Sequence, residues 1–245
     1  MDFCVGGIIL PSDAALLTHG HESQFLDQLL AERPKAIVAT ASQAGGIEDM
    51  ISMYVQPRLK GCLPDSVLGF ETEAMLVKGI AKQSKRFGLP LELLTDDVLA
   101  RHGIKHELGS NIIVPLAFLH KQGYKDQLVY VTYGNISFEE MYTFGKAVQM
   151  AIKISKKKTA ILAAANIATQ DSKWQNEFIE SLQNRDVKTM LDMAYNLPVD
   201  VAVDQLRSVF LLLGALSTIE FANKEIKLWQ YNNHIFVSGG FARVI

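Results

Sequence analysis

Several features that usually identify a class of protein are scarce in this chain of 245 residues. It has only 2 cysteines, Cys4 and Cys62, which have no metal-binding spacing and are too few for a disulfide framework. We expect both thiols to be reduced and buried in the core. The formal net charge of -2 and the sequence pI of about 6.3 show no excess of basic residues, so nothing supports binding to nucleic acid.

Long hydrophobic segments are also missing. The longest apolar runs, VFLLLGAL (209–216) and IIVPLAFL (112–119), have about eight residues, far fewer than the roughly 20 that cross a bilayer. The first residues, MDFCVGGIILP, lack the basic stretch of a signal peptide. These absences predict a soluble, cytoplasmic protein with no membrane partner.

What is present is a series of short apolar runs that alternate with longer amphipathic segments, with 49% hydrophobic residues overall. This pattern is typical of an α/β fold with a central sheet flanked by helices, and we predict a single domain over residues 1–245. Strands are predicted at 3–10, 36–41, 66–70, 91–94, 127–133, 159–165, 226–231 and 234–241. Helices are predicted at 22–32, 72–87, 111–122, 138–156, 172–193 with a break, and 200–217.

Local signals refine this pattern. Ser137, followed by Glu139 and Glu140, predicts a capped start for the helix at 138–156, and the lysines at 156–158 are interpreted as its C-terminal end rather than as an anion site. Segment 54–65 is predicted to be a loop that shapes the mouth of a pocket. The Gly-Gly pairs at 6–7, 45–46 and 239–240 indicate close backbone packing, because none fits a phosphate-binding motif.

Polar residues follow several predicted strands or begin a predicted helix. Ligands of open α/β sheets bind outside the carboxyl ends of the strands. Asn166 and Thr169 follow one strand, and their side chains form hydrogen bonds but do not titrate near neutral pH. We predict a pocket at this edge, lined by Ser12, Asp13, Gln43, Ser110 and Asn232.

Four stretches, in their order along the chain, are similar to a known family. GGIILP (6–11) is similar to an opening strand that enters a P-H-P-P turn, and NIIVPLAFL (111–119) to the helix after a D-H-G motif. VYVTYGNISFEEMYTFGKAVQMAI (129–152) is similar to a strand, turn and helix unit, and RSVFLLLGAL with WQYNN and SGGFARV to a closing helix and C-terminal end. The chain thus resembles the class III extradiol ring-cleavage dioxygenases, the LigB-like family that includes Memo-type proteins. The resemblance implies a three-layer, phosphorylase/hydrolase-like architecture, aromatic ring-opening oxidoreductase chemistry with Fe(II), and a homodimer or companion subunit.

The resemblance also places the family's iron ligands on residues that bind iron poorly. The two ligand histidines fall on Ser12 and Gln43, and the ligand glutamate falls on Asn232. Non-haem Fe(II) is held by two neutral imidazoles and a carboxylate. Because hydroxyl and amide groups replace all three, we expect no metal cofactor.

The family's acid–base histidines are replaced as well. By the same resemblance, these positions fall on Ser110, Asn166, Thr169 and Leu206. None of these side chains moves a proton near pH 7, as ring cleavage requires. We therefore expect a pseudoenzyme that binds a small polar or aromatic ligand, or a partner.

Two alternatives stay open. One is an active metal-dependent ring-cleavage dioxygenase with ligands drawn from elsewhere. The candidate metal ligands of this alternative are His19, His21, Glu22, Asp13 and His234. A simpler interpretation of THGHES is a helix start exposed to solvent. The other is an assembly protein whose pocket is filled with its own side chains.

Overall fold

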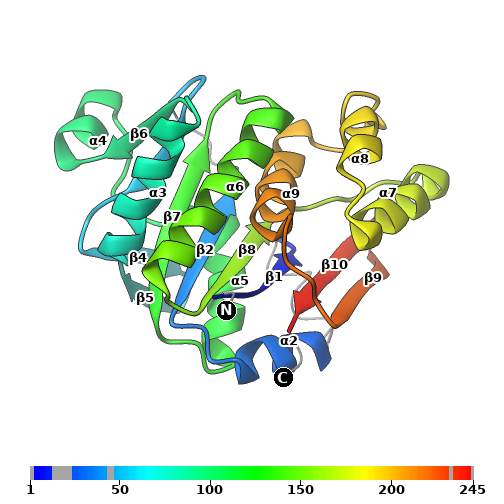
Figure 1. Cartoon of the computed structure of the whole chain (residues 1–245), viewed down its shortest axis with the longest axis horizontal. Helices are drawn as coiled ribbons and strands as arrows, with labels where there is room; N and C mark the ends of the chain where they lie inside the picture. Colours follow the sequence, from blue (N-terminus) through cyan, green and yellow to red (C-terminus); the bar gives the residue numbers. More distant parts are fainter. Residues whose placement is uncertain (1–2, 13–23, 43–46, 232–233, 244–245) are drawn as a thin grey trace.

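The computed structural model of the chain describes residues 3–12, 24–42, 47–231 and 234–243. Its centre is an eight-stranded sheet (Figure 1). The strands lie side by side in the order β6 (Leu91–Leu94), β3 (Ile51–Tyr54), β7 (Gln127–Tyr133), β2 (Ala36–Ala41), β8 (Thr159–Ala164), β1 (Cys4–Leu10), β10 (His234–Ala242) and β9 (Asn223–Tyr231). Strands β7, β2, β8 and β1 are mutually parallel, so their carboxyl ends share one edge of the sheet.

Helices cover both faces of this sheet, which gives three layers. One face carries α3 (Ala74–Arg86), α6 (Phe138–Ser155) and α9 (Val203–Leu216), which lie side by side in Figure 1, together with α7 (Ser172–Asn184) and α8 (Val187–Ala194). The other face packs against α2 (Gln24–Ala31), α4 (Asp96–His102) and α5 (Ser110–Lys121). The predicted α/β architecture with a central sheet flanked by helices is therefore confirmed.

Each central strand contributes to both layers of the core because its side chains alternate between the two faces. In β7, Val129 and Val131 belong to the cluster under α6 and α9, whereas Leu128 and Tyr130 belong to the cluster under α5. Every residue of β1, β2 and β8 is buried. Such continuously apolar strands are expected where helices cover both faces of a parallel sheet.

The prediction of a loop over 54–65 is wrong. Strand β4 (Arg58–Leu63) occupies most of this segment and pairs with β5 (Ser66–Glu71) in a separate antiparallel hairpin. The expectation that both cysteines are buried fails here too, since Cys62 lies on the exposed side of β4, while Cys4 is buried. Two short elements, β3 and α4, were not predicted. A four-residue strand and a seven-residue helix are too short for the periodic spacing of apolar residues to be recognised.

Several local predictions are confirmed. Ser137 and Glu140 form a reciprocal capping box at the start of α6, and Lys156 ends this helix in a left-handed conformation. The helical segment over 172–193 is broken between α7 and α8, where Arg185 also has a positive φ. A Cβ on Gly240 would collide with the carbonyl oxygen of Gly7 on β1, which accounts for glycine at this strand pairing.

No helix within the described ranges is long and apolar enough to cross a bilayer.

Candidate functional site

The carboxyl ends of the parallel strands bring polar side chains from five elements together. Ser12 follows β1, Ser42 follows β2, and Asn166 lies just beyond β8. Two helix starts complete the group, with Asn111 in the first turn of α5 and Gln205 in the first turn of α9. We call these five residues the carboxyl-end network.

The network is a continuous chain of hydrogen bonds. The backbone N–H of Ser12 donates to Oδ1 of Asn166 at 2.8 Å, and the backbone N–H of Asn166 donates to Oε1 of Gln205 at 3.1 Å. The amide of Gln205 then donates to Oγ of Ser42 at 3.1 Å, and Nδ2 of Asn111 donates to the carbonyl oxygen of Ser42 at 2.7 Å. These bonds connect residues as far apart in sequence as Ser42 and Gln205.

All five members are partly buried, so the network lies at the surface of the sheet edge and not in the core. Unused capacity remains within it. No described residue accepts a hydrogen bond from Nδ2 of Asn166 or pairs with the hydroxyl of Ser12. An amide has two N–H donors and a hydroxyl both donates and accepts, so these groups can bind the oxygen atoms of a ligand.

Ser110 joins the edge of the network. It is the first residue of α5, its side chain is exposed, and its hydroxyl donates to Oδ1 of Asn111 at 3.3 Å. The structure therefore brings the sequence-predicted residues Ser12, Ser110 and Asn166 to one region.

Thr169 and Leu206 lie elsewhere. The Thr169 hydroxyl is buried and donates to Asp200 at 2.9 Å, while its backbone pairs with Ile235 of β10. Leu206 is 1% exposed and packs in the core under α9. Thr169 thus connects the segment after β8 to Asp200 and to strand β10, and Leu206 stabilises the packing of α9.

Other candidates fall outside the described residues. These are Asp13, Gln43 and Asn232 of the predicted pocket and His19, His21 and Glu22 of the alternative metal site. His234 begins β10, where its backbone pairs with Tyr231.

Sequence reasoning missed Ser42, Asn111 and Gln205. Gln205 stands beside Leu206 in the first turn of α9, where Leu206 starts the apolar run of the helix. An amphipathic helix directs its polar residues away from its apolar face. A polar residue in the first turn of such a helix is therefore a candidate for contact with the nearby strand ends. Ser42 gave no signal, because its role depends on partners distant in the sequence.

Two titratable groups that the structure describes near this edge, Tyr133 and Arg207, are occupied with structural bonds. Tyr133, the last residue of β7, shares a hydrogen bond with Ser208 at 2.7 Å and donates to the carbonyl oxygen of Asp204 at 2.8 Å. Burial raises the pKa of Tyr133, so the phenol stays protonated near neutral pH. Arg207 donates to the carbonyl of Ile136 and pairs with Asp204. Neither group serves as a general base.

The chemistry of the donors decides whether iron fits. Ser12 and the other members of the carboxyl-end network supply hydroxyl, carbonyl and amide oxygens, without an imidazole or a carboxylate. Throughout the residues that the structure describes, no three His, Cys, Asp or Glu side chains lie close enough to hold a metal ion. The described donor set does not fit Fe(II), which prefers imidazole and carboxylate ligands.

The family described as the catalytic LigB subunit of aromatic ring-opening dioxygenase matches residues 17–242. The chain belongs to this LigB family, as the sequence resemblance indicated. The uncharacterized protein JW3007 of Escherichia coli K12 has a similar crystal structure, with a TM-score of 0.66, 11% identity and coverage of 97% of this chain and 100% of that one. At that identity the likeness concerns the fold alone.

A curated relative is the protein CA_C1420 of Clostridium acetobutylicum. It is 20% identical over 210 residues, which cover 79% of this chain and 45% of that protein. The chain therefore spans about half the length of this relative.

Proposed function

We propose that this chain is a non-catalytic member of the LigB family that binds a small polar or aromatic molecule at the carboxyl ends of the parallel strands. The observation that carries the proposal is the carboxyl-end network. Its members bond to one another through uncharged groups, at the sheet edge where α/β proteins bind ligands.

The choice of ligand follows from the groups that have no partner among the described residues. The amide nitrogen of Asn166 and the hydroxyl of Ser12 suit a carbonyl, carboxylate or phenol oxygen. A small aromatic molecule with hydroxyl or carboxylate substituents meets these requirements. We also propose that the chain forms a homodimer or binds a companion subunit, which light scattering tests. A cytoplasmic location is proposed as well, and cell fractionation tests it.

The first experiment measures catalysis and metal together. The purified protein is analysed for iron and incubated aerobically with added Fe(II) and 3,4-dihydroxybenzoate, whose ring opening is followed by absorbance. We expect iron far below one equivalent and no ring-opened product. Stoichiometric iron with ring opening would overturn the proposal in favour of a ring-cleavage dioxygenase that draws its ligands from other residues.

The second experiment measures binding by calorimetry with catechol and 3,4-dihydroxybenzoate. We expect saturable binding that weakens about tenfold in Asn166→Ala, the loss of one or two ligand hydrogen bonds. Asn184→Ala, at an exposed position on α7, is the matched control and should leave binding unchanged. Failure of both probes to bind would favour the assembly protein with a filled pocket.

A further inference from the structure

A cavity lies at the opposite edge of the sheet, at the amino ends of the parallel strands, with a volume of about 610 Å³. Lys35 precedes β2, Lys125 and Asp126 precede β7, and Lys157 precedes β8. The hairpin of β4 and β5 closes another side with Arg58 and Glu71, which are cross-strand partners. We call this cavity the amino-end pocket; its size is within the range of small-molecule sites.

The hairpin is fixed beside the start of β7. Thr72, directly after β5, forms a parallel bridge with Leu128, and the backbone N–H of Glu73 donates to the carbonyl oxygen of Leu128 at 3.0 Å. The pocket therefore lies between elements that are bonded to each other and does not depend on a free loop.

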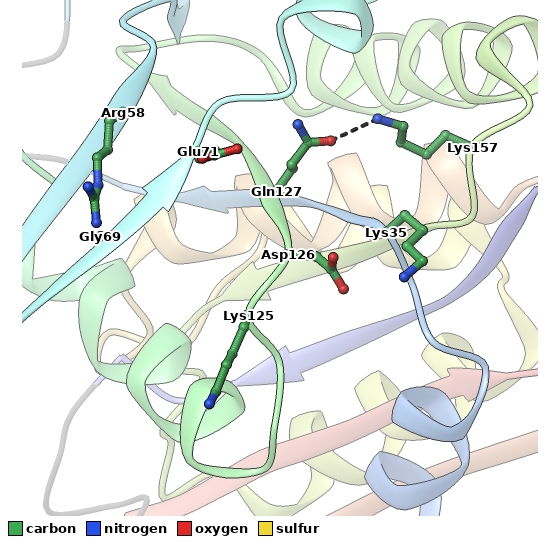
Figure 2. A pocket seen from close by; sticks show the side chains of 8 residues that line it. All are labelled: Lys35, Arg58, Gly69, Glu71, Lys125, Asp126, Gln127 and Lys157. Carbon is green, nitrogen blue, oxygen red and sulfur yellow. Dashed lines mark hydrogen bonds between the residues drawn. The ribbon is translucent and has the colours of Figure 1, made fainter.

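Three cations of the pocket lack partners. The side chains of Lys35, Arg58 and Lys125 form no ion pair and no hydrogen bond with any residue in the described ranges. Figure 2 shows Lys35 and Arg58 on opposite sides of the start of β7, with Lys125 extending away from Lys157. Arg58 lies against Gly69, since a Cβ there would be 3.0 Å from its Nε atom.

Lys157, interpreted from the sequence as part of a helix end rather than of an anion site, lines the pocket and is held in position by protein partners. Its Nζ atom donates to Gln127 at 2.8 Å, drawn as the dashed line in Figure 2, and pairs with the buried carboxylate of Glu73. An ammonium group has three N–H donors, so one remains for a ligand. A donor that is already fixed loses little side-chain entropy when the ligand binds.

The pocket is also lined by two carboxylates, Glu71 and Asp126, beside four cations. Cations without partners suit phosphate oxygens, and carboxylates accept hydrogen bonds from hydroxyl groups. We propose that the amino-end pocket binds the phosphate ester of a small hydroxyl-rich molecule, such as a sugar phosphate or nucleotide, with the phosphate on Lys35 and Lys157, which lie on the same side of the start of β7 in Figure 2, and the hydroxyls on Glu71 and Asp126.

The test is calorimetry at low ionic strength with ribose 5-phosphate, glucose 6-phosphate and AMP, and with ribose and inorganic phosphate as partial ligands. We expect at least one phosphate ester to bind saturably at about one equivalent, more tightly than either partial ligand. Lys35→Gln should weaken binding about tenfold, the loss of one charge-assisted bond, and Arg58→Gln, on the other side of the start of β7, should weaken it less.

Two further variants test the direction of the charge effect on phosphate binding and provide a control. Glu71→Gln removes a negative charge and should tighten the binding of inorganic phosphate, which has no sugar hydroxyls for Glu71 to accept, whereas Lys82→Gln, at an exposed position on α3 outside the pocket, should change nothing. Absence of saturable binding by all three esters, equal weakening in Lys82→Gln, or weaker binding of inorganic phosphate in Glu71→Gln would overturn the proposal. Because Asn166→Ala should leave phosphate binding intact, this result is separable from the fate of the carboxyl-end site.

Discussion

The two ends of the same parallel strands have opposite chemistry. At the carboxyl ends, Ser12, Ser42, Asn166 and Gln205 are uncharged and bond mainly to one another. At the amino ends, Lys35, Arg58 and Lys125 line a cavity and have no partner among the residues that the structure describes. The first arrangement uses most of its polar groups in bonds within the protein, whereas the second leaves three charges available.

This contrast shows that the two edges of one sheet in a LigB-family fold can carry different chemistry. Uncharged hydrogen bonds connect the polar residues at the carboxyl ends, while both core layers are packed. Charge concentrates instead at the amino-end edge. The predictions below test each half of the contrast.

The largest expected effect comes from giving the carboxyl ends metal ligands. We predict that Ser12→His/Gln43→His/Asn232→Glu binds about one equivalent of Fe(II), since it supplies two imidazoles and a carboxylate. Metal analysis after dialysis against Fe(II) under nitrogen measures the gain, and Ser12→His alone is the control with one imidazole. A triple variant as free of iron as the parent would show that these positions do not converge.

The next effect concerns the buried ion pair beside the amino-end pocket. The side chain of Glu73 is 5% exposed and that of Lys157 is 32% exposed. Lys157→Met leaves the Glu73 carboxylate buried without a partner, and we expect a loss of about 2–4 kcal/mol in the free energy of unfolding. Urea denaturation measures it.

The double variant Glu73→Leu/Lys157→Met provides the control for this pair. It should recover most of the loss, because no buried charge is then left unpaired. If the double variant were as unstable as the single one, packing rather than charge would explain the effect.

A third prediction concerns alkaline pH and compares one tyrosine from each end. Burial raises the pKa of Tyr124, before β7, and of Tyr133, at its end. Both phenols stay protonated in the folded state, so their contribution to stability is complete below pH 10 and is lost as the pH rises above it. The loss should be about 1.4 kcal/mol per pH unit for each tyrosine.

Urea titrations between pH 9 and about pH 11 measure this slope. Tyr124→Phe and Tyr133→Phe should each make it shallower, despite a lower stability at neutral pH from the lost hydrogen bond. An unchanged slope in both variants would mean that neither tyrosine controls the alkaline transition.

The smallest effect is expected within the carboxyl-end network. Gln205→Leu removes the partner of the Asn166 backbone N–H and of the Ser42 hydroxyl, and should cost about 1 kcal/mol, since water reaches this partly buried edge. Gln170→Leu, at an exposed position, should change stability by less than about 0.5 kcal/mol. Equal losses of stability in the two variants would show that the hydrogen bonds of Gln205 do not stabilise the protein.

Much of the fold follows from local sequence. The runs that became β1, β2, β7 and β8 are mostly apolar, and the start of α6 follows from Ser137 and Glu140. Strand β4 was missed because Arg58, Lys60 and Cys62 alternate with inward residues beside Pro57 and Pro64, which looks like a loop when the pairing partner is unknown.

The candidate site also contains residues that the sequence predicted and residues that it missed. Ser12 and Asn166 were found because each follows a strongly apolar strand. Gln205 was missed although it stands next to a residue that was considered, Leu206, because only the rotation of α9 in the folded protein decides which of the two faces the strand ends.

The sequence by itself determined that Ser12, Gln43 and Asn232, where the family resemblance places the iron ligands, carry hydroxyl and amide groups, because the identity of a side chain fixes its charge and its affinity for iron. Only the tertiary structure decided which of these groups bond to one another and that basic residues from three strand starts and a hairpin surround one cavity. Such relations depend on strand order and register, which bring together residues that are far apart along the chain.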